Sequence, residues 1–298
     1  MIITRFVFIT LLFISITSCS DKFNEEKEIR TNCKQGASLK KVLIVGWDGV
    51  RTDALLAAET PNLDSLLKNS IYTFNCDRGP FTVSVPGWSS LLHGVWPDKH
   101  NLRENSFRKN RFDEFPDIVK ILKGQRPELS AVVLSNWDDF LRITSNEDYA
   151  QRYDNDWQVT NAANALIGDC SSDIFVLHYD FPDYIGHSIG FSPTSIEYLN
   201  SIEITDYYLG EILENVYWRE SNLNEEWLVV VTTDHGGEGT GHGGQDDLPQ
   251  TRNVWAVLRF PNQSQIEIPS FKIVDVLPTI LKWFGVNPNS NLDGTSLN

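Results

Sequence analysis

Short, uninterrupted apolar runs alternate with amphipathic segments along most of this chain. Residues 42–46, 131–135, 174–179, 227–233 and 253–260 are candidate buried strands. Helical periodicity or helix-start signals lie at residues 61–68, 116–123, 162–167, 193–216 and 273–284. Continuous apolar strands that alternate with helices are typical of parallel sheets covered on both faces. The pattern therefore predicts an α/β domain with a doubly wound, mostly parallel sheet.

Size and charge narrow the classes of partner. The chain has 298 residues, enough for one large α/β domain, and a formal net charge of -15 at pH 7. Such a charge argues against a nucleic-acid polymer as the partner, because phosphate backbones bind basic surfaces. A small anionic substrate remains compatible if bound metal ions supply positive charge locally.

The N-terminal segment has the features of an export signal. Arg5 precedes an apolar run, Phe6 to Thr17, that is short for a membrane span, and Ile16 to Cys19 resembles a bacterial lipobox. We therefore expect residues 1–18 to be a lipoprotein signal peptide and 19–38 a polar tether, anchored to the membrane only through lipid on Cys19. The predicted location is the periplasm or cell surface of a bacterium; an ordinary secretory signal cut nearby is the alternative.

Export also makes disulfides possible. Cys33, Cys76 and Cys170 remain after the predicted processing, and an odd number cannot pair completely within one chain. A bridge between Cys76 and Cys170 and a set of small buried thiols are both compatible with the sequence.

Carboxylate and imidazole side chains follow several of the predicted strands. Asp48 comes two residues after the first strand, Asp183 follows residues 174–179, and Asp234 and His235 directly follow residues 227–233. Ligands of such sheets bind beyond the carboxyl ends of the strands, so we expect these side chains to meet there. The alternative is that Asp48 and Asp234 cap helices and His235 is incidental.

Two more histidines extend this set. Asp183 and His187 are four residues apart, which places both on one side of a helical turn. His242 lies in a glycine-rich loop, where packing gives little reason for a histidine, although an exposed loop residue is the alternative. Carboxylate oxygen and imidazole nitrogen suit Zn²⁺. The nearby His178 and Asp180 are expected to be core residues or to support the ligands.

Ser84 is the candidate nucleophile. Pro86 suits the first turn of a helix that runs to about His93, so Ser84 would stand just before a helix N-terminus. Amide N–H groups and the helix dipole favour an anion there, and a metal bound to Ser84 would favour its alkoxide. A capping serine explains the position equally well, and Thr82 is a neighbouring competitor.

The order and spacing of several short segments resemble the alkaline phosphatase superfamily, and within it the type I phosphodiesterase/nucleotide pyrophosphatase branch. These segments are residues 46–49, 84–87, 182–187, 234–236, 241–243, 275–281 and 292–294. The likeness spans roughly residues 40–298, so residues 39–298 are expected to form the catalytic domain.

The resemblance implies two Zn²⁺ ions per chain. One would be held by Asp183, His187 and His242, and the other by Asp48, Asp234, His235 and Ser84. Ser84 would attack phosphorus in a small phosphodiester and form a covalent phospho-enzyme. The chain departs from the usual branch pattern in carrying Ser84 for Thr and Gly87 for Asn. Asn105 is the candidate for contacting the substrate phosphate instead.

Three other functions remain open. A phosphomonoesterase would use the same zinc core. Sulfatases share the fold and carry a Cys/Ser-x-Pro-x-Arg motif, but here Trp88 stands where that motif has Arg. A non-catalytic surface lipoprotein could keep the fold for binding alone.

Overall fold

The computed structural model describes residues 38–170, 172–244, 247–287 and 291–297. The predicted signal peptide, Cys19, Cys33 and almost all of the predicted tether lie outside these residues. Within the described ranges, no helix has both the length and the apolar character needed to span a membrane.

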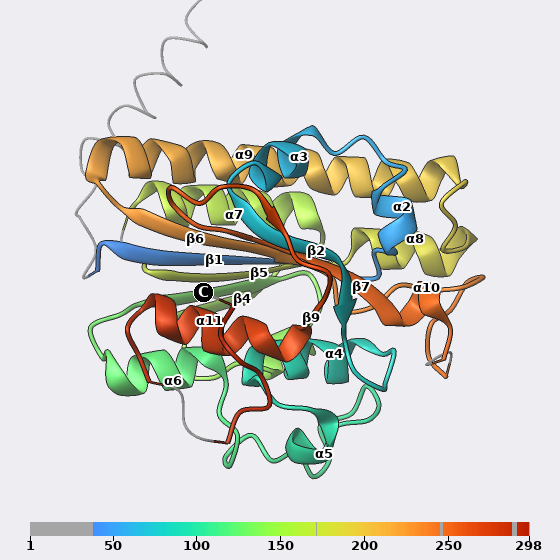
Figure 1. Cartoon of the computed structure of the whole chain (residues 1–298), viewed down its shortest axis with the longest axis horizontal. Coiled ribbons are helices and arrows are strands. Elements are labelled where there is room, and N and C mark those ends of the chain that lie inside the picture. The colour runs from blue at the N-terminus through green and yellow to red at the C-terminus, as the bar shows by residue number, and fades with distance from the viewer. Residues whose placement is uncertain (1–37, 171, 245–246, 288–290, 298) are drawn as a thin grey trace, which may run out of the picture.

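A nine-stranded sheet forms the centre of the domain (Figure 1). Its parallel part runs in the order β4 (Tyr149–Arg152), β3 (Ala131–Ser135), β5 (Ile174–Tyr179), β1 (Lys40–Trp47) and β6 (Glu226–Thr232). β7 (Asn253–Arg259) pairs antiparallel with β6 and with β2 (Ser70–Asp77). The short strands β8 (Ile266–Glu267) and β9 (Phe271–Lys272) pair parallel to β2. The mostly parallel sheet predicted from the sequence is therefore confirmed.

Helices cover both faces of this sheet (Figure 1). One face carries α3 (Pro61–Leu67), α7 (Asp156–Gly168) and α9 (Ile196–Leu223), and the other carries α4 (Ser84–His93), α6 (Ile118–Gln125) and α11 (Val276–Trp283). Successive side chains of β1 point to opposite faces of the sheet. Val42 and Ile44 pack in one apolar cluster, and Leu43 and Val45 pack in the other. Burial on both faces is the physical reason for the uninterrupted apolar run.

Four further α-helices connect these elements in the described residues. They are α2 (Thr52–Leu55), α5 (Pro97–His100), α8 (Phe181–Ile189) and α10 (Pro249–Arg252). α8 follows β5 and packs against α9. It therefore sits at the carboxyl end of the parallel strands, where the expected ligands gather.

Several element boundaries differ from those expected. The segment 162–167 is the second half of α7, and the helix expected at 193–216 begins at Ile196 and continues to Leu223. The segment 273–284 starts as a 3-10 turn, and Pro278 falls in the first turn of α11, where its missing N–H costs nothing. β4 was not expected because all four of its residues are exposed and carry no apolar pattern.

The cysteines do not pair as considered. Cys76 is free and buried on β2, inside one of the apolar clusters, whereas Cys170 is disulfide-bonded. The bridge between Cys76 and Cys170 is therefore wrong, and Cys76 acts as a small apolar residue.

Candidate active site

Three neighbouring parallel strands deliver the candidate ligands to one edge of the sheet. Asp48 follows β1, Asp183 lies in the first turn of α8 after β5, and Asp234 and His235 follow β6. β1 pairs with both β5 and β6, so these three strand ends are adjacent. The expected meeting of these side chains occurs.

The first group of side chains surrounds His235. Its Nε2 atom lies 3.1 Å from Ser84 Oγ, 3.2 Å from Asp48 Oδ1 and 3.5 Å from Asp234 Oδ2. Ser84 is the first residue of α4 and is 5% exposed, while Asp48 and Asp234 are buried. Asp48, Asp234 and His235 offer ligand atoms within 4.8 Å of one another, a spacing that a single metal ion could bridge.

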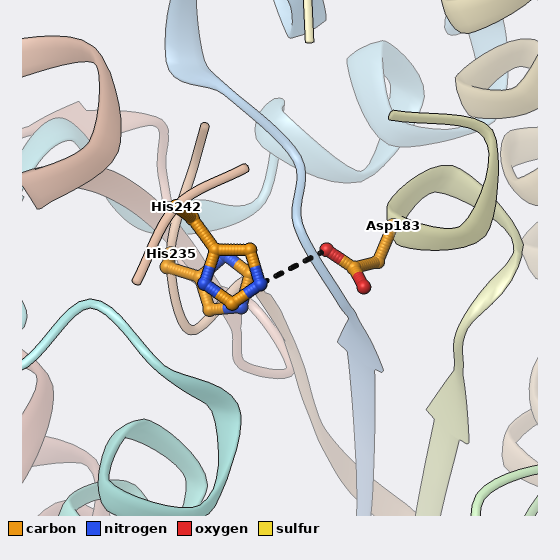
Figure 2. A group of neighbouring side chains, drawn as sticks. All are labelled: Asp183, His235 and His242. Carbon is orange, nitrogen blue, oxygen red and sulfur yellow. Dashed lines mark ion pairs between the residues drawn. The ribbon is translucent and has the colours of Figure 1, made fainter. Parts of the chain in front are cut away.

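The second group consists of Asp183, His187 and His242. His187 Nε2 lies 3.3 Å from Asp183 Oδ2 and 3.0 Å from His242 Nε2, and His242 Nε2 lies 3.8 Å from Asp183 Oδ1. Figure 2 shows Asp183 directed from α8 toward the imidazoles of His242 and His235. Those two rings stack with centroids 3.7 Å apart, so the two groups form one continuous centre.

The hydrogen bonds of the three imidazoles fix their tautomers. The Nδ1 atoms of His187, His235 and His242 lie 2.9, 2.9 and 2.5 Å from the backbone carbonyls of Thr240, Gly236 and Thr82. A carbonyl only accepts, so each Nδ1 carries a proton and each Nε2 atom faces the centre. Burial lowers the pKa of His235 and of His242, so these two rings are neutral and turn an Nε2 lone pair toward the centre. Lone pairs that converge on one another and on carboxylates repel unless a cation lies between them. The donor set therefore fits bound divalent metal.

Unsatisfied carboxylate oxygens support the same conclusion. Four buried oxygens of the centre accept no hydrogen bond among the described residues: Asp48 Oδ1, Asp183 Oδ1 and both oxygens of Asp234. A buried acceptor without a partner costs about 1–3 kcal/mol, more if it is charged. Metal coordination would satisfy all four.

Burial and neighbouring charge shift the protonation of these groups. Burial, reinforced by the charge of Asp48, raises the pKa of Asp234 well above its usual range. Burial lowers the pKa of His235 well below its usual value, which keeps the ring neutral. Burial raises the pKa of Asp183 to about 7, and the hydrogen bond with Asp183 raises the pKa of His187 to about 9. Without metal, a proton is thus held between Asp183 and His187.

The start of α4 differs from the expectation in one respect. Ser84 is inside the first turn of the helix and Val83 is the N-cap. The amide of Val85 donates to Asn105 Oδ1 at 2.9 Å, Pro86 has no N–H, and the amide of Gly87 donates to the carbonyl of Val83. These donors are engaged or missing, so they do not form the expected amide cradle for an anion.

Asn105 is an exposed residue beside the nucleophile candidate, and its side-chain oxygen accepts from the amide of Val85. Thr82, the competing nucleophile, has a different position: its Oγ1 donates to the carbonyl of His242 at 2.6 Å. Thr82 and His242 thus hold each other through two hydrogen bonds.

Gly87 has a steric role. A Cβ atom at this position would lie 2.9 Å from Asp234 Cβ and 3.0 Å from Arg78 Nη2. The Asn of the usual branch pattern therefore has no room here. Arg78 is 2% exposed, and its Nε donates to the carbonyl of Asp234 at 2.5 Å. Arg78 was not singled out from the sequence, where a lone arginine after a strand carries no signal.

Hydrogen bonds from two buried side chains hold Asp48 in position. Its Oδ2 accepts from Trp88 Nε1 and from His178 Nε2, both at 2.9 Å. The other nitrogen of His178 lies 3.1 Å from Ser135 Oγ. Gly46 permits this arrangement, because a Cβ there would lie 2.5 Å from the Trp88 ring. His178 thus supports a candidate ligand, as expected, and Trp88 has a structural use at the position of the sulfatase arginine.

Curated relatives match part of this chain. It is 22% identical over 237 residues to bis(5'-adenosyl)-triphosphatase ENPP4 of Bos taurus, covering 70% of this chain and 50% of that protein. It is 23% identical over 125 residues to 2,3-bisphosphoglycerate-independent phosphoglycerate mutase of Mesomycoplasma hyopneumoniae, covering 42% of this chain and 23% of that one. The chain thus spans about half the length of its ENPP4 relatives.

Solved structures share the fold. Murine ectonucleotide pyrophosphatase/phosphodiesterase 5, in an inactive form with AMP, superposes with a TM-score of 0.65 at 16% identity, covering 83% of this chain and 96% of that one. A 2-O GAG sulfatase gives 0.68 at 16% identity, covering 87% and 73%. Phosphonate monoester hydrolase of Agrobacterium radiobacter gives 0.60 at 14% identity, covering 87% and 76%.

The family itself is decided by the sequence. Residues 42–120 and 127–248, more than half of the chain, match the family described as type I phosphodiesterase / nucleotide pyrophosphatase. These ranges contain Asp48, Ser84 and every other candidate ligand. The chain belongs to the type I phosphodiesterase/nucleotide pyrophosphatase family.

Proposed function

We propose that this protein is a zinc-dependent phosphodiester hydrolase with Ser84 as its nucleophile. One observation carries the proposal: Ser84 Oγ lies 3.1 Å from His235 Nε2, inside a centre of three carboxylates and three imidazoles. A serine alone at a helix start would be a capping residue. A metal held by these six carboxylate and imidazole side chains would favour the alkoxide of Ser84.

We divide the ligands into two sets on the family resemblance, although His235 also lies within 4.8 Å of ligand atoms of Asp183 and His242. Asp48, Asp234, His235 and Ser84 would hold one zinc ion, and Asp183, His187 and His242 the other. Mixed carboxylate and imidazole donors favour zinc over calcium or magnesium, which prefer oxygen alone. When bound, the two ions would supply positive charge to the phosphoryl oxygens and to the attacking and leaving oxygens.

The chain's own groups account for the rest of the proposed reaction. Ser84 Oγ forms a bond to phosphorus while the bond to the leaving alcohol oxygen breaks, which gives a phosphoserine ester; water then cleaves this ester and restores the serine. The α4 dipole favours negative charge at Ser84. Asn105, fixed by its bond to Val85, is the residue we propose to donate its amide to the phosphate.

Diester preference rests on the family and its relatives, which include a bis(5'-adenosyl)-triphosphatase and an enzyme solved with AMP. We therefore expect small phosphate esters or nucleotides as substrates. Phosphate monoesters are the second candidate, because the same donor set would serve both. Sulfate esters are disfavoured, since Trp88 occupies the sulfatase arginine position and bonds to Asp48.

The predicted N-terminal signal and the anchor at Cys19 complete the proposal. They would place the enzyme outside the cytoplasmic membrane, held there by lipid. Replacement of Cys19 by serine should release the protein from the membrane fraction, and unchanged fractionation would contradict the anchor.

The decisive experiment compares three chromogenic esters. We expect the purified, zinc-loaded protein to hydrolyse bis(4-nitrophenyl) phosphate faster than 4-nitrophenyl phosphate, and 4-nitrophenyl sulfate least. Ser84→Ala should abolish turnover while about two zinc ions remain bound. Ser188→Ala, which changes an exposed serine of α8, is the matched control and should be unaffected. Faster monoester cleavage would overturn the diester assignment, and full activity of Ser84→Ala would overturn the nucleophile.

A further inference from the structure

Residues 238–241, between β6 and α10, form a small hairpin beside the metal centre. The amide of Glu238 donates to the carbonyl of Gly241 at 2.8 Å, and the amide of Gly241 donates back to the carbonyl of Glu238 at 3.2 Å. The two residues of the turn between them are exposed to solvent. His242, a candidate metal ligand, follows the hairpin directly and is buried.

The hairpin positions two of the three residues of the second ligand group. The ring of His187 donates from Nδ1 to the carbonyl of Thr240, at the tip of the hairpin, at 2.9 Å. His242 is the next residue after the hairpin, so its position depends on the hairpin backbone. Asp183, in contrast, lies on α8, and the carboxylates of the first group directly follow β1 and β6. Displacement of the hairpin would therefore disturb the second group and leave the first in place.

The guanidinium of Arg51 holds the hairpin from the side of α2. Its Nη1 donates to the carbonyl of Gly237 at 3.2 Å, to Glu238 Oε2 at 3.1 Å and to the carbonyl of Phe191 at 2.9 Å. Its Nε and Nη2 atoms pair with the two carboxylate oxygens of Asp53. Arg51 is only 7% exposed, so solvent screens these contacts weakly. One guanidinium thus joins α2, the turn after α8 and the hairpin, which lie at the same end of the sheet (Figure 1).

Phe191 packs against the hairpin and against the ligands that it positions. Its amide donates to the carbonyl of Gly239 at 2.7 Å. Its ring lies edge-on to the imidazoles of His187 and His242, with centroids 5.4 and 6.1 Å apart. An added Cβ at Gly237 would lie 2.3 Å from this ring, so the backbone at the start of the hairpin packs directly on it. These contacts hold the hairpin in one position without any contribution from a metal ion.

The backbone beside Arg51 contacts both ligand groups. Asp48, three residues earlier, belongs to the first group. Gly49 packs against the second, because an added Cβ there would lie 2.5 Å from Asp183 Oδ1. The amide of Arg51 donates to the buried hydroxyl of Tyr198 at 3.1 Å. Arg51 therefore starts from a fixed backbone, and its side chain relates the position of the hairpin to that of the other ligands.

We propose that the hairpin closes over the second metal ion and that Arg51 is the positioning residue that keeps it closed, so that this ion exchanges with solvent only when the Arg51 contacts break. The inference rests on the metal centre of the proposed function, but not on its catalytic step. The side chain of His187 is 45% exposed beneath the hairpin tip, which places the route to solvent at that ligand. A purely structural role of Arg51 would instead speed the loss of both ions equally.

Release of zinc to a chromogenic chelator, followed by stopped flow, tests this role. We expect Arg51→Met to release one of the two ions about tenfold faster or more, and the other at the wild-type rate, because the hydrogen bonds of a charged group are lost at the hairpin alone. Arg51→Lys keeps the charge without the planar fork and should fall between the two. Arg111→Met is the matched control, since Arg111 also pairs through two nitrogens with a carboxylate, that of Glu114, at an exposed position. Equal acceleration of both ions in Arg51→Met would overturn the proposal.

Two glycines test the hairpin without a change at Arg51. Gly239 has a φ of 58°, a left-handed conformation that disfavours a side chain, whereas Gly241 has no positive φ. An added Cβ would meet no other atom within 4 Å at either position. We therefore expect Gly239→Ala to release one ion about fivefold faster and Gly241→Ala to behave as the wild type. Equal release rates in these two variants would contradict the role of the hairpin.

Hydrogen exchange separates this inference from the catalytic proposal. In the zinc-free protein we expect the peptide that spans residues 236–243 to exchange about tenfold faster in Arg51→Met than in the wild type, with exchange of β1 and β6 unchanged. That result, in a protein that hydrolyses no ester, would overturn the proposed function and leave the closed hairpin standing. Ester hydrolysis with two bound zinc ions, together with unchanged exchange and unchanged zinc release in Arg51→Met, would overturn this inference and leave the proposed function standing.

Discussion

The guanidinium of Arg78 donates from Nε to the backbone carbonyl of Asp234 at 2.5 Å. Its Nη2 reaches the carbonyl of Val83, the residue before Ser84, at 3.4 Å. One buried cation thus joins the end of β6, which carries a candidate metal ligand, to the start of α4, which carries the candidate nucleophile. Arg78 is therefore placed to set the position of Ser84 relative to Asp234.

Replacement of Arg78 should separate positioning from metal binding. Arg78→Met removes both bonds, so we expect kcat/KM to fall tenfold or more with zinc content largely kept, and the free energy of unfolding to fall by about 1.5–3 kcal/mol. Arg78→Lys keeps the charge without the two-pronged geometry and should recover only part of kcat. Urea denaturation, zinc analysis and steady-state kinetics measure these effects. Arg108→Met, at an exposed position, is the control, and equal losses in both variants would contradict the role of Arg78.

Two glycines in helices should respond oppositely to the same substitution. Gly87→Ala places a Cβ 2.9 Å from Asp234 Cβ, and should lower stability and activity together. At Gly124, in α6, an added Cβ would meet no other atom within 4 Å, so Gly124→Ala should stabilise the protein by about 0.5–1 kcal/mol through helix propensity. Gly87→Asn should be worse than Gly87→Ala. Thermal melts and ester hydrolysis measure both effects. An active, stable Gly87→Asn variant would show that the first turn of α4 can move away from Asp234 to make room for the side chain.

Loss of the His178 side chain should weaken metal binding without touching a ligand. His178→Ala removes a hydrogen bond to Asp48 Oδ2, and we expect zinc affinity to fall about 10–100-fold. His178→Gln can donate to the same oxygen and should recover part of the loss. Ser135→Ala, which removes the next partner in the chain, should have a smaller effect. Chelator competition measures all three, and unchanged affinity in His178→Ala would show that Trp88 alone holds Asp48.

The pH dependence of the zinc-free protein follows from the pair Asp183 and His187. The hydrogen bond with Asp183 raises the pKa of His187 to about 9, above its unfolded value of about 6.5. Burial raises the pKa of Asp183 to about 7. When folding raises the pKa of a group, the protonated group stabilises the folded state. This stabilisation is complete below the pKa of the unfolded state and is lost as the pH rises through the pKa of the folded state. The Tm of the zinc-free protein should therefore fall as pH rises toward 9.

Zinc should reverse this trend, because the metal displaces the proton from His187 and its affinity rises with pH. Thermal melts between pH 6 and 9, with chelator and with zinc, test both statements. His187→Gln should flatten the slope seen with chelator. A slope that persists unchanged in His187→Gln would assign the titration to other groups.

The fold could be predicted because its signal is local and repeated. Residues 131–135 and 174–179 are apolar almost without interruption, since β3 and β5 are buried on both faces, and their predicted limits are those of the strands. β4 gave no such signal because it is an exposed edge strand. The long helix α9 was placed, but its last turns were not, because a polar helix end resembles a loop in sequence.

The candidate metal ligands could be predicted from the sequence, but the residues that hold those ligands in position could not. Asp48, Asp183 and Asp234 follow strands, so the order of the chain alone places them at one edge. Arg78 and Trp88 act through contacts with residues that are distant in sequence or across the sheet, and no spacing rule indicates them. The same reason explains the wrong pairing considered for Cys76.

The amino-acid sequence by itself determined the doubly wound sheet, the edge at which the acidic and imidazole side chains gather, and the family. The burial pattern and the order of the strands follow from residues that are near one another in the sequence, so they can be predicted without knowledge of long-range contacts. Only the tertiary structure decided how the rings of His187, His235 and His242 converge and which backbone carbonyls hold them there. Those facts depend on side-chain directions, which packing sets.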